Sequence, residues 1–257
     1  AYVTLAATPQ YVIGAEVLAK CLRRTGTSRR MVAMIGSRIT DIMEQRLRAA
    51  GWEIFRFDEE GIAPEAPDPP DRPMFNATYY KLHVFALGSS FDTVVFLDAD
   101  TLVLKNIDEL FARDLSHGYP FAAAPEIMPP DQFNTGVMVV RPSAAVHADL
   151  VGAASRTQSM DGSVSGYMND RFPDWYQQSS HHRLPFEYNV LQTIAHYYTP
   201  AWDLLRPAMK VLHFAGDGTS KPWSFHGSLP PSLGVYVYLW QSITRAGADE
   251  DISPLFG

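Results

Sequence analysis

Asp98 and Asp100 stand one residue apart at the end of the apolar run Val94–Leu97. The run is rich in β-branched residues, which is typical of a buried strand, so both carboxylates are expected where that strand leaves its sheet. Residues two apart in a strand project to the same side, so both can bind one hard cation such as magnesium or manganese. A metal there predicts an anionic substrate, most simply a phosphate ester. The structural alternative is a solvated strand end with Asp100 capping the next turn.

A histidine lies near the end of a second apolar segment, residues 209–214, and a glycine-containing turn and a lysine follow it. The neutral imidazole of His213 suits manganese or zinc, so it is a candidate third ligand. Gly216 would let backbone amides approach a phosphate, and Lys221 would neutralise that phosphate. The alternative is a histidine with a purely structural role at a strand end.

Three polar segments could complete a site. Residues 134–136, Asn-Thr-Gly, open an expected strand and could bind sugar hydroxyls or form a turn. Residues 161–166, Asp-Gly-Ser-Val-Ser-Gly, form a polar loop that is otherwise a surface connection. The proline-rich segment 58–73 is expected to be an exposed loop, either a connector or a lid that brings Arg72 over the site.

The elements that must position these residues alternate between strands and helices along the chain. Strands are predicted at 2–6, 31–35, 53–57, 94–97, 121–124, 134–140 and 209–214, helices at 13–24, 40–50, 78–87 and 143–155, a capped turn at 106–111 and a polar loop at 159–166. Repeated strand-helix units imply a parallel sheet covered on both faces. The sequence therefore predicts one compact α/β domain.

Composition excludes several classes of function. A formal net charge of −7 argues against broad nucleic-acid binding, which depends on basic patches. The single cysteine, Cys21, excludes an intramolecular disulfide and points to a reducing compartment. No stretch approaches the roughly 20 apolar residues that span a bilayer, and the start lacks the charged region of a signal peptide. We therefore expect a soluble, cytoplasmic protein without membrane partners.

Taken in order, these segments resemble the glycogenins and the wider glycosyltransferase family 8, whose members transfer sugars from nucleotide donors with retention of configuration. The similarity runs from residue 1 to residue 223 and is carried by the segments 72–73, 80–83, 96–104, 133–136, 184–189 and 213–223. It implies a single-domain α/β fold of glycosyltransferase type A, Rossmann-like and nucleotide-binding, with a central mostly parallel sheet. Residues 1–140 would form the nucleotide-binding half, 141–230 the acceptor-side half and 231–257 a C-terminal helix and tail.

The resemblance also implies roles for individual residues. The metal ligands would be Asp98, Asp100 and His213, holding manganese, with magnesium as the alternative, against the donor diphosphate. The nucleoside pocket would be lined by Leu5, Thr8 and Tyr11, with Tyr11 stacking on uracil and Ala99 near the ribose. The diphosphate and donor sugar would be contacted by Arg72, Lys81, Asn134, Thr135, Gly136, Gly216 and Lys221.

The chain departs from the family pattern at three places. Glycogenin-like enzymes carry Asp-Gly-x-Asp-Gln-Gly where residues 161–166 stand, so Val164 and Ser165 replace the Asp-Gln pair. A valine is neither nucleophile nor base, which leaves same-face attack, another acid such as Asp161, or loss of activity. His196 aligns with the tyrosine that glycogenin glucosylates on itself, so self-priming is not expected, although tyrosines follow it at 197 and 198. The turn 213–221 is two residues longer, which is expected to displace Lys221 from the phosphate.

The resulting prediction is a manganese-dependent, retaining hexosyltransferase that uses a UDP-sugar, with glucose as the default hexose. Its catalytic candidates are Asp161, Lys81 and Ser165. The acceptor is a saccharide, protein or small molecule, and a homodimer is left open. One alternative is a nucleotide-sugar-binding protein that lost its chemistry with the Asp-Gln pair. Another is a phosphatase of the haloacid dehalogenase type, which also places Asp-x-Asp after an apolar strand but expects it near the first strand.

Overall fold

A six-stranded sheet with the order β3-β2-β1-β4-β7-β6 forms the centre of the molecule. The computed structural model describes residues 1–59, 62, 75–127, 129–154, 156–157, 159–216, 218–225, 228–247 and 250–256. The sheet consists of β1 (Tyr2–Ala6), β2 (Met31–Ile35), β3 (Glu53–Arg56), β4 (Val94–Leu97), β6 (Phe121–Pro125) and β7 (Phe133–Val140). Strands β1 to β4 pair in parallel, whereas β7 runs antiparallel to both β4 and β6. The predicted mostly parallel sheet is confirmed.

A second, three-stranded sheet with the order β5-β9-β8 lies next to the end of β4. It contains β5 (Thr101–Val103), β9 (Val211–His213) and β8 (Val190–Leu191). The sequence predicted only β9, as part of the longer apolar run 209–214. No such run contains β8, and β5 has three residues, so neither was expected as a separate strand. This small sheet pairs the end of β9 with the residues that follow Asp100.

Helices and helical turns surround both sheets. The α-helices are α1 (Pro9–Arg24), α2 (Asp41–Ala49), α3 (Phe75–Thr78), α4 (Ala144–Ala154), α5 (Val164–Arg171), α6 (Thr193–Tyr197), α7 (Thr199–Leu205) and α8 (Pro231–Arg245). The 3₁₀ turns are η1 (Tyr79–Ser89), η2 (Asp108–Ala112), η3 (Trp175–Gln177), η4 (Ser180–His182), η5 (Phe186–Tyr188), η6 (Gly218–Ser220) and η7 (Ser253–Phe256). Among the helices described, none has both the length and the apolarity needed to cross a bilayer.

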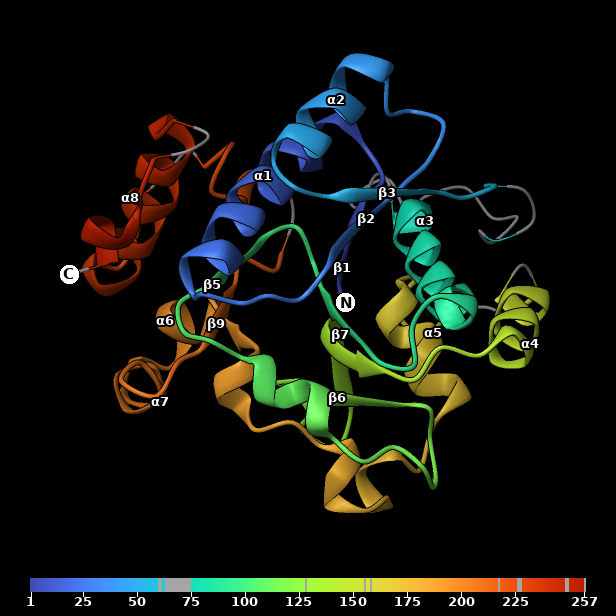
Figure 1. The fold of residues 1–257 in the computed structure, drawn as a ribbon. Helices are drawn as coiled ribbons and strands as arrows, with labels where there is room; N and C mark the ends of the chain where they lie inside the picture. The colour runs from blue at the N-terminus through green and yellow to red at the C-terminus, as the bar shows by residue number, and fades with distance from the viewer. Residues whose placement is uncertain are drawn as a thin grey trace.

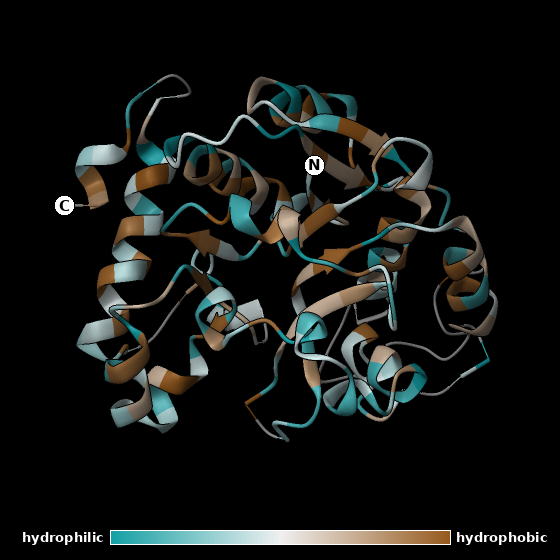
Figure 2. Ribbon diagram, turned by 60° about the horizontal axis from the view of Figure 1, so that its bottom comes forward, coloured by the Kyte–Doolittle hydropathy of each residue, from teal (hydrophilic) through white to brown (hydrophobic). Residues whose placement is uncertain are grey.

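The sheet is covered on both faces, and the alternation of strand side chains explains why. Tyr2 and Val95 belong to one core cluster with residues of α1, whereas Val3 and Phe96 belong to a second cluster with residues of η1 and α5. Figure 1 shows α1 and α3 to α5 on different sides of the strands, with α8 packed beyond α1. In Figure 2 the hydrophobic colour concentrates on the strands, while most helices carry both colours. Cys21 lies in the first cluster, and burial raises its pKa to about 12, so this thiol is structural.

Two predicted elements differ from the structure. The helix expected at 78–87 begins as α3 and continues as η1, a 3₁₀ turn that ends at Ser89. The polar loop expected at 159–166 becomes helix α5 from Val164 onward, because the Ser163 hydroxyl accepts from the Gly166 N–H and caps the helix. The predicted proline-rich loop falls mostly on residues 60–61 and 63–73, outside the described residues, and so does Arg72.

Candidate active site

A tight turn follows β4 and presents the two carboxylates. The Asp98 N–H donates to the Gly136 carbonyl on β7 at 2.8 Å, which fixes the end of the strand. The Thr101 N–H and hydroxyl both donate back to the Asp98 carbonyl, at 3.1 and 2.7 Å. This closes the turn and starts β5, so both side chains stand at the carboxyl end of a parallel strand, as predicted. In open α/β sheets this is the edge where ligands bind.

His213 completes a cluster of three candidate ligands. It ends β9, where it pairs in register with Thr101 of β5. Its Nε2 atom lies 3.3 Å from Asp100 Oδ1 and 3.7 Å from Asp98 Oδ2. One ligand atom from each of the three residues lies within 4.8 Å of the other two. The sequence segments that carried the metal prediction, more than 100 residues apart, therefore meet at one point.

A chain of hydrogen bonds orients the imidazole. The Asn134 amide nitrogen donates to the Glu126 carboxylate at 2.8 Å, which leaves Asn134 Oδ1 to accept from the Asn189 amide nitrogen at 3.0 Å. Asn189 Oδ1 is therefore the acceptor for His213, 2.9 Å from Nδ1. With a proton on Nδ1, the ring presents Nε2 to the carboxylates, and this nitrogen is the one that can bind a cation. A metal-bound histidine usually has such a hydrogen-bond partner on the ring nitrogen that does not bind the metal.

The carboxylates are balanced by two buried ammonium groups. Lys81 Nζ donates to Asp98 at 3.0 Å, and Lys221 Nζ forms an ion pair with Asp100 Oδ2. Burial raises the pKa of Asp98 above its ordinary value, although Lys81 opposes that shift. Burial also acts to raise the pKa of Asp100, but the Lys221 ammonium and His213 outweigh it and hold that pKa below its ordinary value. The longer turn 213–221 thus does not carry Lys221 away from the cluster.

The cluster fits a divalent cation. Asp100 is only 3% exposed, and its Oδ1 atom has no hydrogen-bond partner among the described residues, although it lies 3.3 Å from His213 Nε2. A buried carboxylate oxygen without a hydrogen-bond partner is unfavourable unless a positive charge compensates it. Carboxylate oxygens with one imidazole form a donor set that suits manganese.

Gly136 makes room for the histidine. A Cβ atom at this position would lie 2.2 Å from His213 Cε1 and 2.4 Å from His213 Nδ1. The glycine predicted to contact a sugar is thus also required for the approach of β7 to the imidazole. This is a close-packing role of the kind that glycine serves within strands.

Lys81 connects the carboxylates to helix α5. Besides Asp98, its ammonium donates to the carbonyl and hydroxyl oxygens of Thr135, both at 3.1 Å. The Thr135 hydroxyl is 2.7 Å from Ser165 Oγ, and Ser165 Oγ also accepts from the Thr135 N–H at 3.3 Å. Two catalytic candidates, Lys81 and Ser165, therefore join the carboxylate cluster through one threonine.

The third catalytic candidate is placed differently. The Asp161 carboxylate is exposed and accepts from the hydroxyls of Ser159 and Ser163, which belong to its own loop. No contact between Asp161 and the carboxylate cluster occurs among the described residues. Val164 is 2% exposed and packs in the core cluster that also contains Tyr79 and Tyr167. The position of the missing family carboxylate is thus filled by a core side chain.

Candidate nucleoside residues lie beside the cluster. The Tyr11 ring meets Trp223 edge-on at 5.2 Å, and burial raises its pKa to about 12 while Lys221 opposes the shift. Leu5 and Thr8 are buried, and the Thr8 hydroxyl has no hydrogen-bond partner among the described residues. Ala99 packs its carbonyl against α1, and Gly216 adopts a φ of 128°, which other residues rarely adopt.

Three residues that support the site were not assigned a role from the sequence. Asn189 orients His213 directly, and Glu126 supports Asn189 through Asn134. Gln192 holds the turn after β9 by donating to the carbonyls of Ala215 and Ser220 at 2.8 and 3.1 Å. Asn189 is fully buried and ends the segment 184–189, which carried the family resemblance without implying a role for this residue. Their roles depend on pairing between distant segments, so no local pattern indicates them.

Replacing Asn189 by alanine is expected to weaken manganese binding by about 10- to 100-fold, since the residue that hydrogen-bonds the non-ligating nitrogen of a metal-bound histidine typically contributes that much. The variant frees the imidazole to rotate and to move its proton to Nε2. Manganese affinity measured by electron paramagnetic resonance of free ion in a titration is the readout. Asn189→Asp, which still accepts from Nδ1 but no longer donates to Asn134, is expected to retain more affinity than Asn189→Ala. An Asn189→Ala affinity equal to the parent would contradict the role of Asn189 in orienting the imidazole.

Solved structures share this fold. An active-site mutant of LgtC superposes with a TM-score of 0.67 at 16% identity, covering 95% of each chain. GlyE from Streptococcus pneumoniae TIGR4 superposes with a TM-score of 0.66 at 18% identity, covering 99% of this chain and 61% of that one. Both are glycosyltransferases, and the shared architecture is the type A glycosyltransferase fold.

The sequence comparisons give the family. The profile of glycosyl transferase family 8 matches residues 2–227. Glycogenin-1 of Caenorhabditis elegans is 36% identical over 96% of this chain, and human glycogenin-2 is 37% identical over all of it. The chain belongs to glycosyl transferase family 8, which removes the phosphatase alternative. It spans 55% and 52% of the length of these two relatives.

Proposed function

We propose that this protein is a manganese-dependent, retaining glycosyltransferase that moves a hexose, with glucose as the default, from a UDP-sugar to an acceptor hydroxyl. The observation that carries the proposal is the cluster of Asp98, Asp100 and His213, with its unpartnered Asp100 oxygen at the sheet edge where ligands bind. Family membership and the glycogenin names of the relatives support the choice of reaction and donor.

The residues of the chain divide the work at this site. Asp98, Asp100 and His213 would hold the cation, which when bound supplies a positive charge for the departing diphosphate. Lys81 and Lys221 lie beside the same carboxylates, so their ammonium groups can turn to the diphosphate once the cation balances the carboxylates. We further propose that Tyr11, Thr8 and Leu5 line the nucleoside pocket, next to Ala99 and Gly216.

The same-face route is the one that these residues favour. The bond from the anomeric carbon to the diphosphate oxygen breaks, the acceptor oxygen attacks on the same face, and the acceptor proton passes to the departing phosphate oxygen. Val164 offers no carboxylate, and Asp161 is engaged within its own loop. Ser165 and Lys81 would position the reacting groups through Thr135. Sugar contacts by Asn134 stay a prediction, because its side chain is engaged with Glu126 and Asn189.

Charge balance predicts that metal and nucleotide bind together. Two ammonium groups neutralise two carboxylates in the ligand-free site, so a divalent cation alone adds uncompensated positive charge to a buried region. A diphosphate restores neutrality. We expect saturating manganese to strengthen UDP binding by at least about 100-fold, equivalent to a coupling of about 3 kcal/mol. Calorimetric titration of UDP with and without manganese measures it, and equal UDP affinity in both conditions would contradict the proposal.

One alternative function has a specific observation in its favour. Family members carry a carboxylate where this chain has the buried Val164, so the chain could bind nucleotide sugars without turning them over. Both functions require manganese-dependent UDP binding. They differ in whether UDP-glucose is consumed, which a turnover assay at micromolar protein decides.

A further inference from the structure

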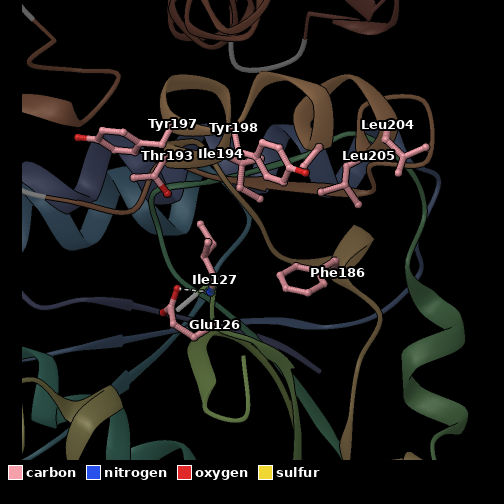
Figure 3. A pocket seen from close by; sticks show the side chains of 10 residues that line it. Glu126, Ile127, Phe186, Thr193, Ile194, Tyr197, Tyr198, Leu204 and Leu205 are labelled. Carbon is pink, nitrogen blue, oxygen red and sulfur yellow. Dashed lines mark hydrogen bonds between the residues drawn. The ribbon is translucent and has the colours of Figure 1, made fainter. Parts of the chain in front are cut away.

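An apolar groove lies between the end of β6 and helices α6 and α7. Its cavity volume is about 540 Å³, which is within the usual range of small-molecule sites. Figure 3 shows Tyr198 and Leu205 on one side, facing Ile127 and Phe186 on the other. Aromatic and aliphatic side chains thus line both walls.

The groove is left open in the described structure. Leu204 is 79% exposed and Tyr198 is 63% exposed, although both are large apolar side chains. Neighbouring exposed apolar side chains that line one concave surface are a common mark of a binding site. The concave shape and the volume fit a compact ring or a short chain better than a flat protein face.

One polar residue joins the groove to the candidate active site. Glu126 lines the groove, and its Oε2 atom accepts from the Asn134 amide nitrogen at 2.8 Å. Asn134 is bonded to Asn189, which in turn is bonded to His213. Three hydrogen bonds therefore connect Glu126 in the groove to His213 in the candidate active site. Each carboxylate oxygen of Glu126 accepts one protein N–H and keeps a further lone pair for a hydroxyl.

We propose that this groove binds the apolar aglycone of the acceptor, so that the acceptor is a saccharide carrying an aromatic or alkyl group, with its hydroxyls toward Glu126. The inference rests on the proposed function for the identity of the reaction. The apolar walls take the aglycone out of water, and the Glu126 carboxylate accepts hydrogen bonds from the hydroxyls of the attached sugar. A free sugar can contact Glu126 but leaves the apolar walls of the groove uncovered, so we expect it to bind more weakly.

The test compares acceptors that differ only in the aglycone. With UDP-glucose and manganese, phenyl glucoside is expected to show a KM at least about tenfold lower than methyl glucoside, since burying an aromatic ring favours binding by at least that factor. Saturation-transfer NMR of the two glucosides reads binding without turnover. Equal affinity for both glucosides would overturn the proposal.

Paired surface variants locate the site. Leu204→Glu is expected to raise the KM for phenyl glucoside about tenfold and to leave UDP release from UDP-glucose in water unchanged, because it places a charge in the groove wall. Val235→Glu, at an apolar position on α8 that is 64% exposed, is the matched control and should change neither quantity. A Leu204→Glu variant with unaltered phenyl glucoside binding would contradict the proposal. If light scattering shows a dimer that Leu204→Glu dissociates, the groove is instead an interface between two copies.

These experiments distinguish failure of the proposed glycosyltransferase function from failure of the groove assignment. Manganese-dependent release of UDP with no preference for an apolar aglycone leaves the proposed function standing and removes the groove assignment. Leu204-dependent binding of phenyl glucoside with neither UDP binding nor UDP release leaves the groove as a ligand site and removes the proposed function.

Discussion

Asp100→Asn is expected to abolish the manganese-dependent thermal stabilisation of this protein by UDP and UDP-glucose. The buried carboxylate supplies one of three candidate ligands, and its free oxygen faces the imidazole. An amide in its place keeps the shape and removes the charge that a divalent cation requires. We expect turnover to fall by at least about 1,000-fold, since a Lewis-acid contribution is worth several kcal/mol. Scanning fluorimetry with manganese, with magnesium and with chelator measures the loss of stabilisation.

The same substitution leaves Lys221 without its charged partner, so a fall in stability must be separated from the loss of metal. Removing one partner of a buried ion pair costs about 3–5 kcal/mol. The double variant Asp100→Asn with Lys221→Met removes both charges and should recover part of that stability without recovering metal binding. Asp92→Asn, exposed and just before β4, is the matched control and should behave as the parent. An undiminished manganese-dependent shift in Asp100→Asn would refute the metal assignment.

Gly136→Ala is expected to remove most manganese affinity without touching a ligand. The added methyl group would stand 2.2 Å from His213 Cε1, so the ring must leave its place between Asn189 and the carboxylates. We expect manganese affinity to fall by about 10- to 100-fold, as when a ligating histidine loses the partner that orients it. Overpacking should also lower the free energy of unfolding by about 1–3 kcal/mol. Manganese titration and chemical denaturation measure the two effects.

Gly152→Ala provides a matched control for that variant. Gly152 lies in helix α4, where an added Cβ meets nothing within 4 Å, and alanine favours a helix over glycine by about 0.5–1 kcal/mol. This variant should keep full manganese affinity and gain slight stability. Parental manganese affinity in Gly136→Ala would mean that β7 and His213 can separate freely, contrary to the packing described above.

The sequence was sufficient to predict the main sheet and the position of the carboxylate pair. The apolar run 94–97 and the alternation of strands with helices in residues 2–57 carry strong local signals, and the structure places both as expected. From the residue types alone, His213 was a candidate third ligand beside the alternative of a structural role, and the resemblance to a known family then implied that it joins Asp98 and Asp100. In the structure the cause is visible, because β5 and β9 pair Thr101 with His213.

The parts that escaped prediction depend on long-range pairing or on a single cap. Strands β5 and β8 are too short to show a period, and Asn189 acquires its role only when β8 brings it beside His213. Helix α5 begins one residue after Ser163, whose capping hydroxyl converts an expected loop into helix and buries Val164. The local sequence Asp-Gly-Ser-Val-Ser-Gly favours a loop, so the helix is imposed by packing and the cap together.

Whether the family reaction survives this change is the central question for the protein. Val164 removes a carboxylate, while Lys81, Thr135 and Ser165 keep a hydrogen-bonded connection between α5 and the cluster. A site whose remaining catalysis is electrostatic can still promote departure of the diphosphate, because charge stabilisation and positioning contribute most of the rate in such reactions.

Release of UDP from UDP-glucose by micromolar protein, followed with and without manganese, decides whether this protein is an enzyme. We predict release that depends on manganese, stops with chelator and is absent in Asp100→Asn. Tight manganese-dependent binding of UDP-glucose with no release of UDP above the protein-free rate would contradict the enzyme assignment and leave a nucleotide-sugar-binding protein.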